Sequence, residues 1–177
     1  NNCDFNVLKS TLTGNLTIGN QSTVNINGDM TVEGYAQLSA GIVNINGDMT
    51  VGGYVQLSAG TVNLNGNMTV EGDYTHSSNT KYATTTIINE GSKLTINGNL
   101  IQYYPNSSGN SYASKIYVNG SLNVGGYYQG YSYPNVDIYM NNDNSYMEVN
   151  GNFTYGSSDK SANFTKGKIK VGGSYYN

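Results

Sequence analysis

The 177-residue chain lacks tryptophan, and it contains one cysteine and two prolines. Charged residues make up only 11% of the sequence, no arginine is present, and the net charge is −3. Nucleic-acid binding depends on basic side chains that displace counterions. The composition therefore argues against a nucleic-acid partner.

Two further absences concern covalent links and membranes. Cys3 has no second cysteine within the chain, so any disulfide it forms is intermolecular. No stretch approaches the run of about 18 apolar residues that a membrane-spanning helix needs. The chain opens on Asn1 without an initiator methionine or a signal peptide, as expected of a processed or trimmed chain.

What the sequence does contain is a tandem repeat with a period of 19 residues. It reads VNINGDMTVEGYAQLSAGI, then VNINGDMTVGGYVQLSAGT, then VNLNGNMTV, from Val24 onward. Within each copy apolar residues alternate with polar ones, and Asn-Gly or Glu-Gly interrupts the alternation. Period-2 alternation inside a longer identity period is typical of a β-solenoid, in which each copy is one turn.

Antiparallel hairpins are the competing interpretation, because Asn-Gly is a strong hairpin signal. A three-residue loop would pair Ile26 with Met30 and satisfy the pattern. However, the outward residues repeat as well, for example Asn25, Asn44 and Asn63. Identical side chains form ladders only between stacked parallel coils, so we favour the solenoid.

The corner motif extends this prediction to one all-β domain over 1–177, a single-stranded parallel β-solenoid of about eight rungs. A lead-in strand is expected at 1–11, regular 19-residue coils at 12–72, and wider, irregular, tyrosine-rich coils with insertions at 73–177. The glycines taken to mark one corner are Gly14, Gly28, Gly47, Gly66, Gly98, Gly120, Gly151 and Gly173. On this alignment the first coil is short, with 14 residues from Gly14 to Gly28.

An asparagine precedes most of these glycines. Asn and Gly both tolerate positive φ, and stacked carboxamides can bond along a column. We therefore predict a structural corner ladder made of Asn27, Asn46, Asn65, Asn97, Asn119 and Asn150.

Few residues suggest chemistry. Asp29 and Asp48 stand one repeat apart and could hold Ca²⁺ or share a proton, but Asn67 in the next copy favours an ordinary corner position. His76, the single histidine, falls in an expected excursion between coils, where we expect it to be solvated. No catalytic residue, metal site or cofactor is predicted.

Tyrosine is abundant, with 17 residues. Aromatic rings on a flat β surface can stack on sugar faces or cover an interface between subunits, or they can shield the insertions and wide rungs. The candidates for glycan or interface contact are Tyr103, Tyr104, Tyr127, Tyr128, Tyr131 and Tyr133.

A threonine column suggests a minor alternative, which is ice binding. It comprises Thr31, Thr50 and Thr69, and we expect Ile101 and Asn123 to break its continuation. Ice-binding faces usually need a broader array than one short column.

The motif G-[ND]-[LMF]-T-[VIY], preceded by V-N-[IL]-N, resembles the repeats of bacterial secreted β-solenoid adhesins and surface proteins, including those of clostridia. The resemblance implies a solenoid fold and an extracellular or cell-surface location. We therefore expect a non-enzymatic structural protein, a subunit or segment of a surface filament, appendage or adhesin.

The expected partners follow from the same interpretation. They are copies of the chain added head to tail through open solenoid ends, with Cys3 placed to cross-link the joint, or other surface proteins. The alternative is a carbohydrate-binding module that uses the tyrosine-rich half, with polysaccharide as its partner.

Overall fold

The computed structural model describes residues 2–5, 9–19, 23–39, 41–77, 83–103, 113–131, 136–156 and 164–176. These residues form β-strands and turns, and no helix occurs among them. Every strand pairing between them is parallel. The all-β, parallel solenoid predicted from the repeat is confirmed, and antiparallel hairpins are not formed.

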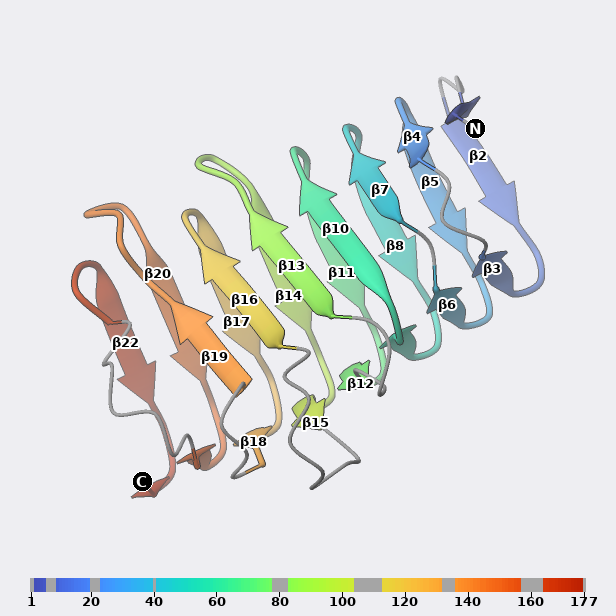
Figure 1. Ribbon diagram of the computed structural model, residues 1–177. Coiled ribbons are helices and arrows are strands. Elements are labelled where there is room, and N and C mark those ends of the chain that lie inside the picture. The colour runs from blue at the N-terminus through green and yellow to red at the C-terminus, as the bar shows by residue number, and fades with distance from the viewer. Residues whose placement is uncertain are drawn as a thin grey trace.

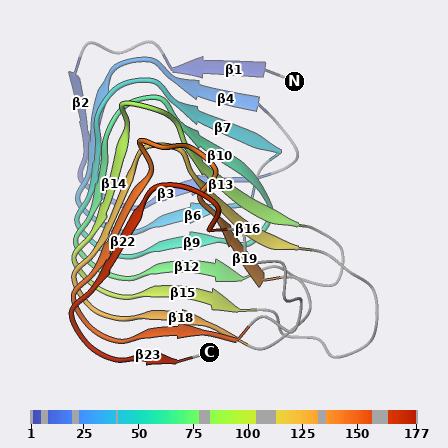
Figure 2. The same cartoon turned by 90° about the vertical axis from the view of Figure 1, so that its left-hand side faces the viewer.

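The strands belong to three sheets, which form the three sides of one coil (Figures 1 and 2). The first sheet has the order β1 (Asn2–Phe5), β4 (Thr23–Ile26), β7 (Ile42–Ile45), β10 (Gly60–Leu64), β13 (Thr84–Ile88), β16 (Ser114–Val118) and β19 (Val136–Tyr139). The second has the order β2 (Lys9–Leu12), β5 (Asp29–Val32), β8 (Met49–Val51), β11 (Met68–Val70), β14 (Lys93–Ile96), β17 (Ser121–Val124), β20 (Tyr146–Val149) and β22 (Lys168–Val171).

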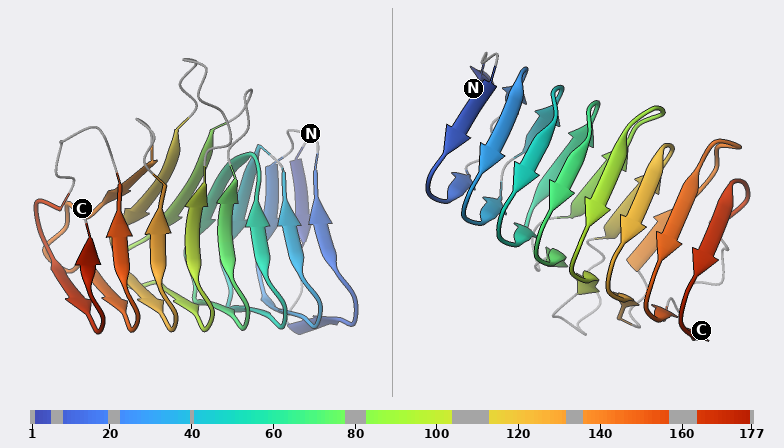
Figure 3. Two further views of the ribbon diagram at one scale, coloured as in Figure 1. Left: turned by 90° about the horizontal axis from the view of Figure 1, so that it is seen from below. Right: turned by 180° about the vertical axis from the view of Figure 1, so that it is seen from behind.

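The third sheet has the order β3 (Leu16–Ile18), β6 (Ala36–Leu38), β9 (Val55–Leu57), β12 (Tyr74–Ser77), β15 (Leu100–Tyr103), β18 (Tyr128–Gly130), β21 (Phe153–Tyr155) and β23 (Tyr175–Tyr176). The chain therefore visits the three sides in turn, and the N- and C-terminal ends lie at opposite ends of the stack (Figure 3).

The core is a set of apolar columns that run along the coil axis. Ile45 pairs in register with Ile26 on one side and with Leu64 on the other, and all three side chains are buried. Alternate residues of each strand point outward, as in β8, where Met49 and Val51 are buried and Thr50 is exposed. The inward and outward assignment predicted from the period-2 pattern is therefore confirmed in these repeats.

Glycines occupy the corner between the second and third sheets because adjacent coils approach closely there. The amide of Gly53 donates to the carbonyl of Gly34 at 2.8 Å, and the amide of Gly72 donates to that of Gly53 at 3.0 Å. A Cβ atom at Gly98 would lie 2.7 Å from the backbone of Gly72, so a larger residue would force the coils apart. The column continues from Gly14 through Gly34, Gly53, Gly72, Gly98, Gly126 and Gly151 to Gly173.

This column corrects the predicted alignment of the coils. Gly14 stacks on Gly34, with a hydrogen bond of 3.1 Å, and not on Gly28. Gly28 belongs instead to the corner between the first and second sheets, where Gly47 stacks on it. The predicted first coil of 14 residues is therefore wrong, since Lys9–Leu12 pairs with Asp29–Val32.

The eight predicted marker glycines consequently divide between two corners. Gly28, Gly47, Gly66 and Gly120 lie between the first and second sheets, whereas Gly14, Gly98, Gly151 and Gly173 lie between the second and third. The two corners were confused because their sequences are alike. Around Gly14 and around Gly28, the corner follows an inward apolar residue and precedes an apolar-Thr-apolar strand. A motif of this length does not distinguish them.

Candidate functional site

The most unusual feature of the interior is a chain of buried polar side chains between the first and third sheets. It begins where the coils widen, at β12 and β13, and its members are fully buried: Tyr74, His76, Thr86, Gln102, Ser114 and Tyr128. Polar groups removed from water are costly unless they are hydrogen-bonded. These six side chains are hydrogen-bonded to one another.

His76 lies at the centre of this network. Its Nε2 atom is 2.8 Å from Oγ1 of Thr86, which is also 2.9 Å from the hydroxyl of Tyr74. Its Nδ1 atom is 3.3 Å from Oγ of Ser114. Nε2 of Gln102 donates to the same Ser114 oxygen at 3.0 Å. Either His76 tautomer satisfies these contacts: the Ser114 hydroxyl donates to Nδ1 when the proton is on Nε2, and Nδ1 donates to Ser114 in the other tautomer.

The network continues to the next rung. The Tyr128 hydroxyl donates to Oε1 of Gln102 at 2.8 Å, so both ends of that carboxamide are bonded. Farther along, Asp137 accepts hydrogen bonds from the hydroxyls of Tyr139 at 3.1 Å and Tyr155 at 3.4 Å. Polar contacts thus link successive coils through the interior from His76 to Tyr128, whereas the Asp137 contacts lie within one coil.

Burial shifts the protonation equilibria in this network toward the neutral forms. Desolvation lowers the pKa of His76 to about 3. It raises the pKa of Tyr74 to about 12, although the hydrogen bond with Thr86 lowers that pKa in part. The pKa of Tyr128 is raised well above its usual value, first by burial and then by the charges near it. His76 is therefore neutral at physiological pH.

The position of His76 corrects the sequence-based expectation of a solvated loop residue. His76 is the third residue of strand β12 and pairs with Leu57 and Gln102 in register. Its contact with a serine hydroxyl has the composition of a nucleophile and base, yet both groups are fully buried. This arrangement does not present the pair to an external substrate.

The tyrosine candidates separate into different environments. Tyr103, Tyr127 and Tyr131 are exposed by 42%, 39% and 40%, and the rings of Tyr103 and Tyr131 meet edge to face at 5.5 Å. Tyr128 is fully buried and packs on Phe153, so its assignment to a glycan or interface surface is wrong. Tyr104 and Tyr133 lie outside the described residues.

The predicted asparagine ladder is present at one corner. Nδ2 of Asn46 donates to Oδ1 of Asn27, and Nδ2 of Asn65 donates to Oδ1 of Asn46, each at 2.7 Å. The next member is Asn89, which bonds to Asn65 at 2.6 Å and which the motif did not identify. Because Asn89 is followed by Glu and not Gly, only the strand register could have located it.

Of the remaining predicted ladder members, Asn119 extends this column, whereas Asn97 and Asn150 lie at the corner between the second and third sheets. Asn119 follows β16 and stacks on the Asn89 rung through its amide, which donates to the Ile88 carbonyl. Asn97 and Asn150 occupy the other corner, so their inclusion in this ladder is wrong. There Nδ2 of Asn97 donates to Oε2 of Glu71 at 2.6 Å.

The stacked aspartates serve the corner. Oδ1 of Asp29 accepts the backbone amide of Asp48 at 3.0 Å, and Oδ1 of Asp48 accepts the backbone amide of Asn67 at 2.9 Å. These bonds give the carboxylates a structural role. No group of three or more His, Cys, Asp or Glu side chains suited to a metal ion occurs in the part of the chain that the structure describes.

The outward threonine column of the second sheet is longer than predicted. Thr31 pairs with Thr11 on one side and with Thr50 on the other, and Thr69 pairs with Thr95 before Asn123 ends the run. Ile101 pairs with Thr75 in the third sheet, so it does not interrupt this column. The neighbouring outward column includes Lys9, Asp29 and Lys93, which breaks the uniform hydroxyl surface that ice binding would use.

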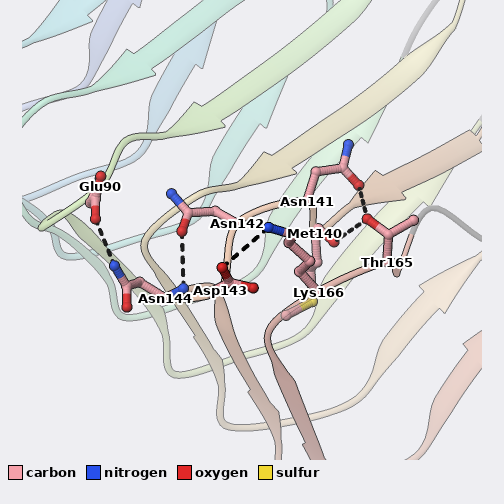
Figure 4. A network of polar contacts seen from close by, with 8 residues as sticks. All are labelled: Glu90, Met140, Asn141, Asn142, Asp143, Asn144, Thr165 and Lys166. Atoms are coloured by element: carbon pink, nitrogen blue, oxygen red, sulfur yellow. Dashed lines mark hydrogen bonds and ion pairs between the residues drawn. The ribbon is translucent and has the colours of Figure 1, made fainter.

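A second polar network lies outside the coil, where the first sheet turns into the second (Figure 4). Asn144 reaches past one rung to donate from Nδ2 to Oε1 of Glu90 at 2.7 Å. Lys166 forms an ion pair with Asp143 at 3.1 Å, and Thr165 donates to Oδ1 of Asn141 at 2.9 Å. The ion pair is largely exposed, so it contributes little stability, and the network mainly holds the widened corners together.

The fold and these sites define the class of the protein as a three-sided parallel β-solenoid with hydrogen-bonded ladders. In comparisons with known proteins, no family model matches the chain, and neither a curated protein nor a solved structure matches it. No helix long and apolar enough to cross a membrane occurs among the described residues.

Proposed function

We propose that the chain is a non-enzymatic structural protein of the cell exterior, a subunit or segment of a surface filament, appendage or adhesin. In this proposal it is a coil of about eight rungs, with a 19-residue repeat in the N-terminal half and wider coils in the C-terminal half, and it assembles with copies of itself through its open ends. The extracellular location is supported by the repeat motif, which resembles secreted solenoid proteins, and by the low charge content.

One observation carries the assembly proposal. At one end of the described stack, β1, β2 and β3 each have a neighbouring strand on one side only, and at the other end the same holds for β19, β22 and β23. Unpaired strand edges present backbone donors and acceptors that invite another chain. Contacts between two different ends do not close on themselves, so their repetition gives filaments.

The hydrogen bonds of β22 indicate which groups face the open end. The amides of Lys168 and Gly172 donate toward the preceding rung, at 2.9 and 2.8 Å. In a parallel strand alternate amides point to opposite sides, so the amides of Ile169 and Val171 face away from β20. Ile169 occupies the inward register position of Met147, yet it is exposed by 39% because no described rung follows it.

The proposal is tested with Ile169→Lys, which places a charge at the open end of the core without removing any contact between earlier rungs. Thr50→Lys adds the same charge on an exposed lateral position and serves as the control. Electron microscopy and sedimentation of the purified chain should show polymers for the native protein and for Thr50→Lys but not for Ile169→Lys. A native chain that stays monomeric at high concentration contradicts assembly through the ends.

Cys3 provides a separate check at the opposite end. Its backbone pairs in register with Val24. The structure does not describe its side chain. If Cys3 links neighbouring subunits, non-reducing electrophoresis should show a reducible dimer that Cys3→Ser abolishes. Loss of the dimer with retention of filaments would separate the cross-link from the assembly itself.

A further inference from the structure

A polar hollow lies on the outer side of the second sheet, in the C-terminal half. It has a volume of about 240 Å³ and spans strands β14, β17 and β20. The side chains that line it are Thr95, Asn97, Asn123, Glu148 and Asn150, with the backbone of Gly125 among them. None of the functions considered above uses these residues as a group.

The hollow exists because one rung lacks a corner side chain. Asn97, Gly125 and Asn150 occupy the same corner position in three successive coils, as shown by the amide of Gly125 donating to Ile96 at 2.7 Å and that of Asn150 donating to Val124 at 2.9 Å. A Cβ atom at position 125 would lie 2.5 Å from the carbonyl oxygen of Asn97, so the close approach of the coils requires glycine. The gap between the two asparagines is therefore fixed by the backbone.

The charge of the hollow is balanced by groups at its margin. Glu148 is the only ionisable residue among those that line it. Its Oε1 atom accepts from Nζ of Lys170 at 2.6 Å and its Oε2 atom accepts from the Tyr146 hydroxyl at 2.9 Å. The Lys170 hydrogen bond, followed by that of Tyr146, lowers the pKa of the Glu148 carboxyl, so it is ionised at neutral pH with a cation beside it. The charge of Lys93 also lowers this pKa, so two cations act on the single carboxylate and a metal cation gains no electrostatic advantage there.

The remaining groups are carboxamides and a hydroxyl, which can donate and accept hydrogen bonds, and Asn97 gives one of its two amide protons to Glu71. Sugar hydroxyls have the same dual character, and a carboxylate with spare acceptor capacity suits them as well. We propose that this hollow binds a neutral sugar unit, a hexose residue of a polysaccharide, through Asn97, Asn123, Glu148 and Asn150. The site does not depend on filament assembly, and it is separate from the exposed tyrosines.

The test is titration of the isotopically labelled protein with glucose, galactose, mannose, N-acetylglucosamine and their short oligosaccharides, followed by amide NMR shifts. At least one neutral sugar should shift the amides of Asn123 and Gly125 and give a saturable curve. Asn123→Ala should weaken that binding by about tenfold, as expected when a hydrogen bond to the ligand is lost.

Two control variants and one control ligand make the result decisive. Thr69→Ala, in the same outward column but above the hollow, and Tyr127→Ala, on the exposed tyrosine surface, should leave the affinity unchanged. Polygalacturonate, the acidic control, should bind no better than its neutral counterparts. The proposal is overturned if no sugar shifts these amides at millimolar concentration, if Asn123→Ala binds as the native chain does, or if only the acidic polymer binds.

Discussion

The buried histidine predicts a specific loss of stability in mild acid. In the folded chain burial lowers the pKa of His76 from 6.5 to about 3. The unfolded chain therefore binds a proton at His76 as the pH falls below about 6.5, while the folded chain does not. Stability from this residue is fully present above the unfolded pKa and declines steadily as the pH falls toward the folded pKa.

The magnitude follows from proton linkage. One proton taken up only by the unfolded chain lowers the free energy of unfolding by about 1.4 kcal/mol per pH unit. Between about pH 6.5 and about pH 5 the loss is therefore about 2 kcal/mol. Carboxylates titrate near pH 4, so this window isolates the histidine.

The matched variant is His76→Phe, which keeps a ring of similar size and removes the titrating group. Thr86 retains the Tyr74 hydroxyl and Ser114 retains the Gln102 amide, so neither partner is left without a hydrogen bond. At about pH 7.5, where His76 is neutral in the folded and the unfolded chain, the variant should be about 1 to 3 kcal/mol less stable than the native chain because it lacks two hydrogen bonds.

The assay is urea unfolding at several pH values from about 7.5 down to about 5, followed by far-ultraviolet circular dichroism. The difference in stability between the native chain and His76→Phe should shrink as the pH falls, because only the native chain is destabilised by acid. Parallel pH profiles for the two proteins would refute the reasoning and place His76 in contact with water.

Two further pairs of substitutions test the inward and outward assignments. Ile45→Asp should destabilise the chain by more than about 4 kcal/mol because it buries an unpaired charge, whereas Thr50→Asp on the exposed face should stay within about 0.5 kcal/mol; denaturant midpoints measure both, and equal effects would contradict the assignment. Tyr128→Phe should cost about 1 to 3 kcal/mol, because the buried Oε1 atom of Gln102 loses its donor, whereas the exposed Tyr127→Phe should be nearly neutral in a thermal melt. A neutral Tyr128→Phe would show that Gln102 finds another partner.

Most of the fold could be predicted from the N-terminal repeats because there the chemistry is simple. Inward positions are apolar, outward positions are polar, and identical residues such as Asn25 and Asn44 bond across coils, at 2.6 Å in this pair. The alternation predicts which residues are buried, and the period predicts which residues stack. The ladder from Asn27 to Asn65 follows from the same two facts.

The alignment of the coils could not be obtained in this way. The segments around Gly14 and Gly28 read almost alike, and each is compatible with either corner. What separates them is the pairing of the whole strand, since Leu12 stacks on Val32 and not on Ile26. That information is spread over a complete coil and is absent from a seven-residue motif.

The interior of the wider coils escaped prediction for a different physical reason. In the third sheet the inward column runs Ile18, Leu38, Leu57, His76 and Gln102, so apolar residues give way to polar ones at the same structural position. A prediction from polarity alone assigns such residues to the surface. They are stable inside because hydroxyl groups of the first sheet face them. Thr86 takes the position that Val62 has in the preceding coil and contacts His76, and Ser114 contacts both His76 and Gln102. Whether such a polar residue is buried therefore depends on its hydrogen-bond partner from another side of the coil. The two residues lie on different strands and come together only in the folded chain.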